Sequence, residues 1–522
     1  MQVSPDGFTA EQRDSVRSIT HNLQISWKKD TNLSATTFAI GVSTIGGDDL
    51  IGINPGAIGS PSNYLYFDES DYVMSLSWER GLNMPTGGLT KAQGEALLDN
   101  TSSRFLPHYM GGNSELFTAI LPRRPFVINA GFNYGGIDQT LAQFVGATDK
   151  RVRIDSRSRT VSLNGTDYLD FFQNRYLDQV SMFTATRSDV IIEDMLSRLG
   201  MSTAQYTLDT GINIVPFGLF DKGTKFADII GELVEAENGH FYQDEQGKFR
   251  FENRQHWDSS PYNQVQKIIY TSQVINAGAP SDSHLINVVE VSSPLYQKQP
   301  MNTLFTLPIG APIEVPGNTS IDKFFEFNDP VLELTNPSNG GADSFYFANT
   351  ESDATGSDRT SSITFTNIGT FAKVAKYRIT NTSSSAVFIT QLQISGRVAK
   401  NVGNIYHREQ NDSSVTAYEE RILTVNNDYI QNQDWAKSYA RMILNDYSEP
   451  ENIQNLTIRA MPDLQLGDLV SWQGRYWRVY DIKSTLTPSG GFVQELTMLK
   501  RTINAYFRIG ISNIGGTDQI AP

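Results

Sequence analysis

Apolar and polar residues alternate along most of this 522-residue chain, which predicts a protein built mainly from β-strands. The clearest example is the last complete module, Asp434–Lys500. Apolar residues at every second position predict strands with one buried face and one solvated face. One series is Leu456, Ile458 and Ala460, and a second is Trp477 and Val479, with Asp481 at the next alternate position. Turns are predicted at Gln473-Gly474 and Ser489-Gly490-Gly491. We expect a small barrel-like sheet with one helix packed on it.

Segments with helical periodicity are few. The helix of the last module is predicted to start at Asp434 as N-cap, with Trp435, Tyr439 and Met442-Ile443 on one apolar stripe. Two more helices are predicted in the middle of the chain. The first, residues 189–199, has Ser188 as its cap and ends at Gly200. The second, residues 225–238, has Asp221 or Thr224 as its cap and ends at Gly239. A hairpin with its turn at Asp244–Gly247 follows.

These patterns predict a mainly β protein with a minor α content, an α+β fold of several domains. We expect a polar leader over residues 1–18 and a first β-barrel over 19–175. A small helix-plus-hairpin domain spans 176–255. A second barrel is predicted from 256–294 together with 398–500, interrupted by an inserted β-sandwich at 295–397, where short strands alternate with Ser, Thr, Asn and Pro turns. Residues 501–522 are predicted to form a C-terminal arm.

One sequence pattern occurs twice. Phe38–Ile51 and Phe507–Ile520 align without gaps and share nine of fourteen residues. Alternating apolar residues before a Gly-Gly pair predict an edge strand or arm, with which a neighbouring subunit can pair. The subunit-interface candidates are Phe38, Ile40, Ile45, Phe507, Ile509 and Ile514.

Composition narrows the possible functions. A net charge of −15 argues against binding to nucleic-acid backbones, although acidity is common among soluble proteins. The absence of cysteine excludes disulfides, thiolate zinc sites and cysteine nucleophiles. Apolar runs fall short of the roughly 20 residues that cross a bilayer, and the N-terminus lacks the features of a signal peptide. We expect no membrane insertion.

Candidate chemistry is sparse. The six histidines, His21, His108, His240, His256, His284 and His407, lack zinc-site spacing. The segment Gly218–Lys225 approaches a P-loop but ends in Thr-Lys instead of Lys-Ser/Thr. The carboxylates Glu232, Glu235 and Glu237 are interpreted as a solvated helix face in preference to a glycosidase pair. Trp472, Tyr476 and Trp477 are interpreted as packing residues in preference to a sugar platform, and Asp353 and Asp358 as a polar loop in preference to a calcium site. No catalytic residue, metal or cofactor is therefore predicted.

Two stretches resemble a known family. The string LQLGDLVSWQGRYWRVYDIK at Leu464–Lys483 is similar to the tube-like domain of phage tail hub proteins. The residues Leu98-Asp99-Asn100, followed by Arg104-Phe105-x-Pro107, resemble the N-terminal part of phage minor tail and hub proteins. The helix and hairpin at residues 176–255 resemble the peripheral domain of the same family.

The resemblance implies a structural virion protein of a phage tail, assembled in the host cytoplasm. Two tail-tube-like barrels per subunit would form a homotrimeric baseplate hub with six similar barrels, closing the distal end of the tail tube. The implied partners are a distal tail or tail-tube ring protein, the tape-measure protein, and tip, fibre or receptor-binding proteins. During ejection, DNA would pass through an acidic lumen without specific binding.

Two alternatives remain open. The protein could recognise host glycans or a receptor through the inserted sandwich, which is compatible with a hub. Less in keeping with the sequence, it could be a cell-wall or polysaccharide hydrolase. We expect no enzyme.

Overall fold

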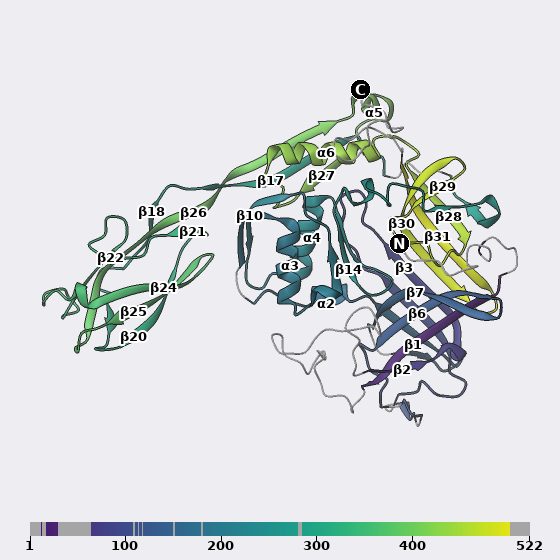
Figure 1. Cartoon of the computed structure of the whole chain (residues 1–522), viewed down its shortest axis with the longest axis horizontal. Helices are drawn as coiled ribbons and strands as arrows, with labels where there is room; N and C mark the ends of the chain where they lie inside the picture. Colours follow the sequence, from purple (N-terminus) through teal and green to yellow (C-terminus); the bar gives the residue numbers. More distant parts are fainter. Residues whose placement is uncertain are drawn as a thin grey trace.

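The computed structural model describes residues 12, 17–29, 64–107, 110–112, 114–116, 118–149, 152–178, 181–279 and 284–501. Strands dominate and helices are few, which confirms the predicted mainly β, α+β class. Figure 1 shows a large body on the right and a smaller domain on the left, joined by a long ribbon of strands. Among the described helices, none combines the length and apolar content needed to cross a bilayer.

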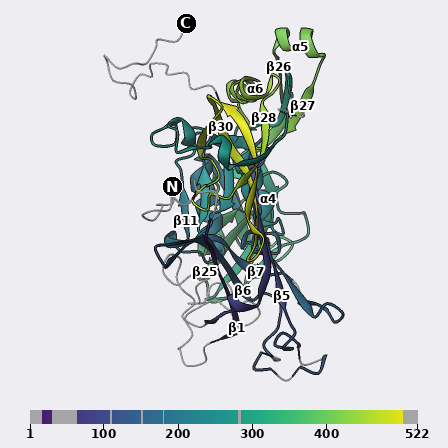
Figure 2. The same cartoon turned by 90° about the vertical axis from the view of Figure 1, so that its right-hand side faces the viewer.

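The body is organised around a 14-stranded sheet that joins both ends of the chain. Strand β3 near the N-terminus pairs with β30 near the C-terminus, and Trp78 lies opposite Ser484. Figure 2 shows the yellow C-terminal strands running down onto the purple N-terminal ones. The strands of this sheet are β1 (Ile19–Lys29), β2 (Tyr64–Asp68), β3 (Val73–Gly81), β5 (Gln93–Asp99), β6 (Pro125–Tyr134), β7 (Ile137–Thr148), β8 (Arg153–Asp155), β9 (Thr160–Thr166), β15 (Lys267–Ile268), β16 (Val274–Ala277), β28 (Ile453–Arg459), β29 (Leu469–Trp472), β30 (Arg475–Thr487) and β31 (Gly491–Arg501).

A helical unit lies in the middle of the molecule (Figure 1). It contains the helices α2 (Leu169–Gln173), α3 (Ser188–Arg198) and α4 (Phe226–Glu237), and the strands β4 (Gly88–Leu89), β10 (Ser181–Arg187), β11 (Tyr206–Leu208), β12 (Ile214–Phe220), β13 (His240–Gln243) and β14 (Phe249–Glu252). β10 pairs with β12, and the others form the sheet β11-β14-β13-β4. The predicted hairpin turn at Asp244–Gly247 is present: the Asp244 carboxylate accepts hydrogen bonds from the backbone N–H groups of Gln246 and Lys248.

The predicted N-caps of α3 and α4 are wrong. The N-caps are Arg187 and Lys225, neither of which makes a side-chain capping bond. Ser188 is the first residue of α3, and its hydroxyl donates instead to the buried Glu237 carboxylate at 2.9 Å. At the end of α4 the left-handed residue is Asn238, with φ of 51°, one position before the predicted Gly239. Gly200 does end α3 as predicted: it has φ of 79°, and its N–H donates to Ser197 O.

The ribbon is built from β17 (Val288–Lys298) and the 24-residue β26 (Val387–Gln410), with β27 (Ile422–Asn426) parallel to β17. Helix α6 (Gln433–Tyr447) packs on the ribbon, and α5 (Asp412–Tyr418) links β26 to β27. Asn432 caps α6 by accepting from the N–H groups of Asp434 and Trp435, so the prediction of Asp434 as N-cap is wrong by two residues. Tyr439 and Ile443 are buried, as the apolar stripe predicts.

The far end of the ribbon carries a domain, which we call the distal domain, with its own apolar core, which includes Tyr377, Ile379 and Ile389. Its three-stranded sheet β20-β25-β24 packs against the strands that pair with the first half of β26. The strands are β18 (Asn302–Thr306), β19 (Ile313–Val315), β20 (Ser320–Glu326), β21 (Val331–Leu334), β22 (Ser338–Asn339), β23 (Phe345–Asn349), β24 (Ile363–Phe371) and β25 (Val374–Asn381). Among the described residues, 3-10 turns occur at Ser70–Tyr72, Thr203–Gln205, His256–Asp258, Thr271–Gln273 and Thr360–Ser362.

The cores do not follow the order of the chain. Ala460, Leu486 and Phe492 of the last module pack into the core of the N-terminal strands, beside Trp27 and Trp78. Strand β17, most of which falls in the first segment (256–294) of the predicted second barrel, pairs with β26 and β27, whereas β28 to β31 belong to the main sheet. The predicted domain boundaries and the closure of two barrels therefore remain predictions.

Candidate functional site

The strongest candidate for a functional surface is a polar face that runs across six strands of the main sheet, in the order β28-β31-β30-β3-β5-β9. Strand register places its side chains in straight rows, because residues directly opposite each other share one face of a sheet. The first row is Thr457, Glu495, Lys483, Glu79, Gln93 and Thr166; the second is Arg459, Val493, Thr485, Ser77, Glu95 and Asn164. We call these two rows, with Asp481 beside them, the polar face.

All side chains of the polar face are exposed or half-buried, and Val493 is its one apolar member. Four carboxylates lie on it against two cations: Glu79, Glu95, Asp481 and Glu495 against Arg459 and Lys483. Lys483 Nζ lies 3.8 Å from Glu495 Oε2, and both side chains are more than half exposed, so this pair contributes little to stability. The hollow over the middle of the face, of about 310 Å³, is lined by Ser77, Glu79, Glu95, Asn164 and Lys483 among others.

Asp481 is the most perturbed carboxylate of the polar face. Burial raises its pKa to about 7, and the nearby negative charge of Glu79 adds to this effect. Opposite Asp481 lies Gly81, where a Cβ atom would collide with the Asp481 carboxylate. A crowded, acidic position of this kind holds a proton near neutral pH.

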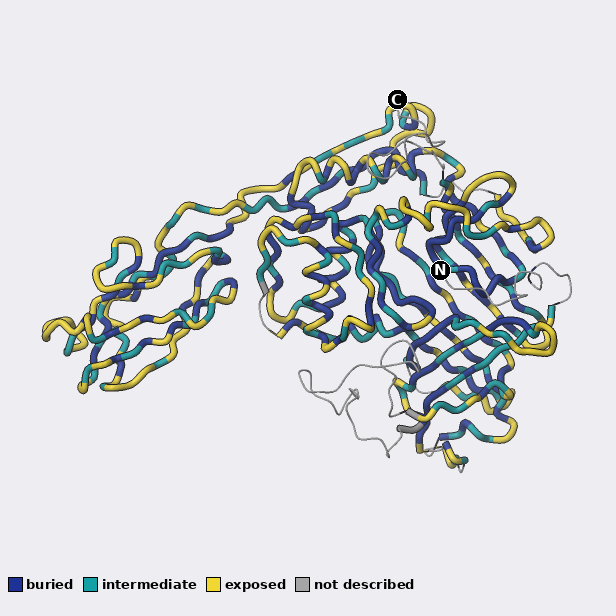
Figure 3. The backbone as a smooth tube through the Cα atoms, in the orientation of Figure 1, coloured by how far each residue is buried: buried dark blue, intermediate teal, exposed yellow. Residues whose placement is uncertain are grey.

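The other face of the same strands is dry. Leu76, Trp78, Ala96, Leu486 and Phe492 are buried there. Figure 3 shows the buried and exposed residues alternating along the strands of the body. Gly94 and Gly165 face this core: a Cβ at Gly94 would lie 2.8 Å from the Phe144 ring, and one at Gly165 would lie 2.7 Å from the Phe126 ring. The two glycines therefore admit aromatic rings close to the sheet.

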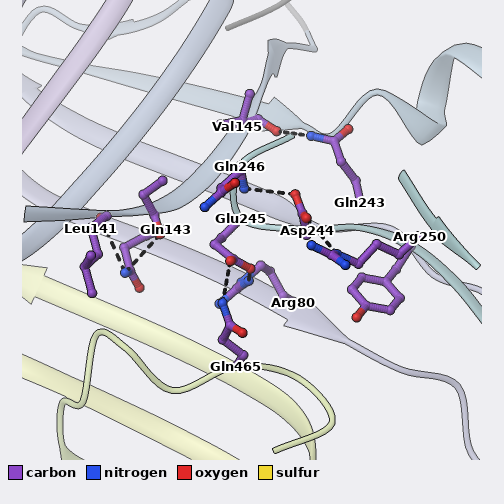
Figure 4. Close-up of polar contacts among 12 residues, drawn as sticks. Arg80, Leu141, Gln143, Val145, Gln243, Asp244, Glu245, Gln246, Arg250 and Gln465 are labelled. Carbon is purple, nitrogen blue, oxygen red and sulfur yellow. Dashed lines mark hydrogen bonds and ion pairs between the residues drawn. The ribbon is translucent and has the colours of Figure 1, made fainter. Parts of the chain in front are cut away.

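A buried set of hydrogen bonds connects the hairpin of the helical unit to the main sheet (Figure 4). Arg80 Nη1 donates to Glu245 Oε2 at 3.0 Å, and Gln465 Nε2 donates to Glu245 Oε1 at 2.5 Å. Gln243 Nε2 donates to Val145 O at 2.7 Å. Three distant segments of the chain thus meet at one hairpin, which fixes the helical unit relative to the sheet.

The Asn-x3-Arg-Phe-x-Pro residues of the sequence resemblance hold a loop in place through hydrogen bonds and a buried ring. Asn100 Oδ1 accepts the backbone N–H of Phe105 at 2.9 Å, and the Phe105 ring is fully buried. Arg104 grips the buried Glu69 carboxylate through Nε at 2.9 Å and Nη2 at 3.0 Å, and Trp27 Nε1 donates to the same carboxylate at 2.9 Å. These contacts orient a loop beside the sheet and contain no reactive group.

The sequence-predicted interface residues Phe38, Ile40, Ile45, Phe507, Ile509 and Ile514 lie outside the described residues. Their role at a subunit interface therefore remains a prediction.

The interpretation of the acidic residues of α4 as a solvated face is wrong in part. Glu237 is buried and accepts from Ser188 Oγ and from the N–H groups of Ile212 and Asn213, so it pins a loop to the helix. Glu232 is exposed, and Glu235 accepts from Asn427 Nδ2 at 3.3 Å. The three carboxylates have different roles and form no common site.

The other candidates for chemistry have structural surroundings. Trp472 and Trp477 are buried, and Tyr476 is exposed. Asp353 and Asp358 each accept a backbone N–H and a hydroxyl two residues later, from Thr355 and Thr360. Neither Asp221 nor Thr224 caps α4 with its side chain. His108 lies outside the described residues. No group of three or more histidine, aspartate or glutamate side chains suited to a metal ion occurs in the described ranges.

The sequence reasoning missed the polar face itself. Alternation marks one wet face on each strand, but it does not say which strands lie side by side. The signal that the chain did offer is the series Ser77-x-Glu79, Gln93-x-Glu95 and Lys483-x-Thr485, polar at every second position in strands far apart in sequence.

Comparisons with known proteins find similarity in structure alone. No protein-family model and no curated protein matches the sequence. Among solved structures, a 43 kDa prophage tail protein from Shewanella oneidensis aligns over 84% of this chain and 95% of its own, with 9% identity and a TM-score of 0.43. A tail protein from Neisseria meningitidis aligns over 84% and 94%, with 9% identity and a TM-score of 0.43. An E. coli type VI secretion component, which is itself structurally similar to T4 bacteriophage tail proteins, aligns over 83% of this chain and 74% of its own, with 8% identity and a TM-score of 0.38.

Proposed function

We propose that this chain is a structural protein of a phage tail, a hub that closes the distal end of the tail tube. In this proposal three copies form a ring, and the polar face of each copy lines the central channel. A distal tail or tail-tube ring protein and the tape-measure protein contact the ring on one side, and tip, fibre or receptor-binding proteins contact it on the other.

The observation that carries the proposal is the polar face. It extends over six strands from both halves of the chain, is almost free of apolar side chains, and has more carboxylates than cations. A wall of this kind stays hydrated, and its negative charge repels DNA phosphates, so DNA can slide past without being held.

Mass measurement by light scattering at several concentrations tests the ring. We expect a species near three times 58.1 kDa, alone or after addition of a tail-tube ring protein. A monomer under both conditions would contradict the proposal. The variant Glu79→Lys/Glu95→Lys adds a charge test: in phages carrying it we expect fewer completed DNA ejections, while Glu314→Lys/Glu326→Lys in the distal domain serves as the control.

A second function, host glycan recognition by the distal domain, is favoured by one surface. Phe324 is 61% exposed on the outer side of the β20-β25-β24 sheet, with Lys376 Nζ 5.5 Å from its ring centre. Asp322 lies two residues away on the same side and pairs with Arg378. An exposed ring beside groups that form hydrogen bonds can hold a sugar by stacking and polar contacts.

Binding of the full chain to host-cell polysaccharide tests this second function. We expect Phe324→Ala to weaken binding about tenfold, and Phe347→Ala, which removes another exposed ring of the same domain, to leave it unchanged. Equal binding by both variants and the unaltered chain would remove this function without affecting the hub.

A further inference from the structure

A polar pocket of about 170 Å³ lies where α6, the end of α4, the segment after β14 and the end of β31 meet. We call it the junction pocket. The residues that decide its chemistry are His240, Arg254, Asp258, Asp446, Tyr480 and Arg501. It lies apart from the polar face: its lining and that of the hollow on the polar face share no residue.

Arg254 is the unusual member of the junction pocket. A guanidinium carries five N–H donors, yet among the described residues Arg254 makes no hydrogen bond and no ion pair, and its Nη1 is buried without a partner. The group is nevertheless held in place, because it stacks over the Trp435 ring at 3.8 Å, and Trp435 Nε1 donates to Ala236 O at 3.0 Å. Leaving a buried charged donor unsatisfied is costly, which points to a ligand that accepts these bonds.

His240 supplies a second unused polar group. Its side chain is more than nine-tenths buried, and Nδ1 has no partner among the described residues. The ring stacks on Trp257, with 4.9 Å between ring centres, so its plane is also fixed. Burial lowers the pKa of His240 to about 3, and the ring is therefore neutral near pH 7 and offers one N–H donor.

The charges of the junction pocket define the ligand. Arg501 pairs with Asp446, and Asp258 also interacts electrostatically with Arg501. Arg254 is left as the cation without a direct partner, although the carboxylate of Glu237 lies near enough to act on its charge. The Arg254 guanidinium, close to the two carboxylates, suits a monoanion better than a phosphate dianion. The second negative charge of the phosphate would be repelled by Asp258 and Asp446.

We propose that the junction pocket binds a carboxylate group, held by the Arg254 guanidinium as a two-pronged donor with an N–H of His240 beside it. The carboxylate is that of a small organic acid or of an acidic side chain on a polypeptide that docks at this junction. Occupation ties α6 to the helical unit and so stiffens the contact between the ribbon and the body.

Thermal unfolding of the full chain, followed by tryptophan fluorescence, tests this proposal. The probes are sodium acetate, the peptide Glu-Glu-Glu with its neutral analogue Gln-Gln-Gln, and sodium phosphate, all at constant ionic strength set with sodium chloride. The variants are Arg254→Gln and Arg254→Lys, and Arg153→Gln serves as the control because it removes an exposed arginine far along the main sheet.

We expect acetate at 0.1 M to raise the unfolding temperature by about 1 °C or more in the unaltered chain and in Arg153→Gln. The shift should vanish in Arg254→Gln and shrink in Arg254→Lys, which keeps the charge but loses the fork. A larger shift with Glu-Glu-Glu than with acetate assigns the site to a polypeptide, and the reverse order assigns it to a small acid. No shift with any carboxylate, an equal shift in Arg254→Gln, or a larger shift with phosphate would overturn the proposal.

Discussion

Two arginine–carboxylate pairs of nearly identical geometry show how differently the body and the distal domain are built. In the body, Arg104 grips Glu69 through two hydrogen bonds of 2.9 and 3.0 Å, and in the distal domain Arg378 grips Asp322 through bonds of 2.8 and 3.1 Å. Glu69 is fully buried and also accepts from Trp27, whereas half of the Arg378 side chain is exposed. The same arrangement of hydrogen bonds therefore lies in the interior of the body and on the surface of the distal domain.

This contrast extends to the organisation of the chain. The body takes strands from both halves of the chain and mixes their side chains in one core, while the distal domain has a separate core and is connected through β17 and β26. A change in the body should therefore affect residues hundreds of positions away, and a change in the distal domain should stay there. None of the six tryptophans lies within the distal domain, so their fluorescence reports on the rest of the molecule.

The largest effect is expected from Arg104→Ala. It leaves the buried Glu69 carboxylate without its cation, which should lower the free energy of unfolding of the body by about 3 kcal/mol. Urea unfolding followed by tryptophan fluorescence measures this loss. Arg378→Ala is the matched control, and we expect it to leave the tryptophan transition unchanged. Equal urea midpoints of the tryptophan transition in the two variants would contradict the difference between the body and the distal domain.

A smaller loss is expected where the sheet admits aromatic rings. In Gly165→Ala the new methyl group would contact the Phe126 ring, so we expect a loss of about 1–3 kcal/mol from overpacking. Gly223→Ala is a control for removing a glycine, because no atom lies near its Cβ position; its positive φ should cost about 1 kcal/mol. A Gly165→Ala protein that is as stable as the unaltered chain would show that the core is looser than its packing indicates.

The polar face should show its acidity in the pH dependence of stability. The pKa of Asp481 is raised to about 7 by burial, so the protonated form favours folding. This contribution is fully present below the unfolded pKa near 4 and is lost as pH rises through 7. Asp481→Asn should therefore flatten the stability profile between pH 5 and 8 and be more stable at pH 8 by about 1 kcal/mol, after allowance for solvent screening. Chemical unfolding at each pH checks this, and parallel profiles would contradict it.

The smallest effect is expected from removing the distal domain. Lys298 of β17 lies opposite Ala399 of β26, so residues 299–398 can be replaced by Asn-Gly, which closes a two-residue hairpin. We expect the tryptophan unfolding temperature to change by less than about 2 °C, because the two cores are separate. A body that no longer folds would show that the ribbon is part of its core.

The sequence predicted the strands well where one face is wet. Leu456 and Ile458 are buried as their alternation indicates, and Glu79 and Glu95 are exposed. Alternation failed at Trp477–Tyr480, where four consecutive residues are buried because Trp257 and its neighbours cover the second face. The helix caps failed where several capping residues stand within two positions of each other, as with Asn432 and Asp434.

The candidate surfaces could not be predicted because they depend on long-range pairing. The polar face needs Glu79 opposite Lys483, a register between strands some 400 residues apart. The junction pocket needs Arg254 stacked on Trp435, which no local pattern indicates. The sequence shows the net charge and the lack of zinc-site spacing among the histidines, but neither property locates the polar face or the junction pocket.

The most direct test of the central proposal measures whether the polar face lines a channel. The chain has no cysteine, so Thr485→Cys places a single spin label on the polar face, and Thr366→Cys places one on the distal domain. Electron spin resonance on assembled tails then measures distances between copies. The proposal predicts one narrow distance between labels at 485, shorter than any between labels at 366. Labels at 485 without mutual coupling, or farther apart than those at 366, would contradict it.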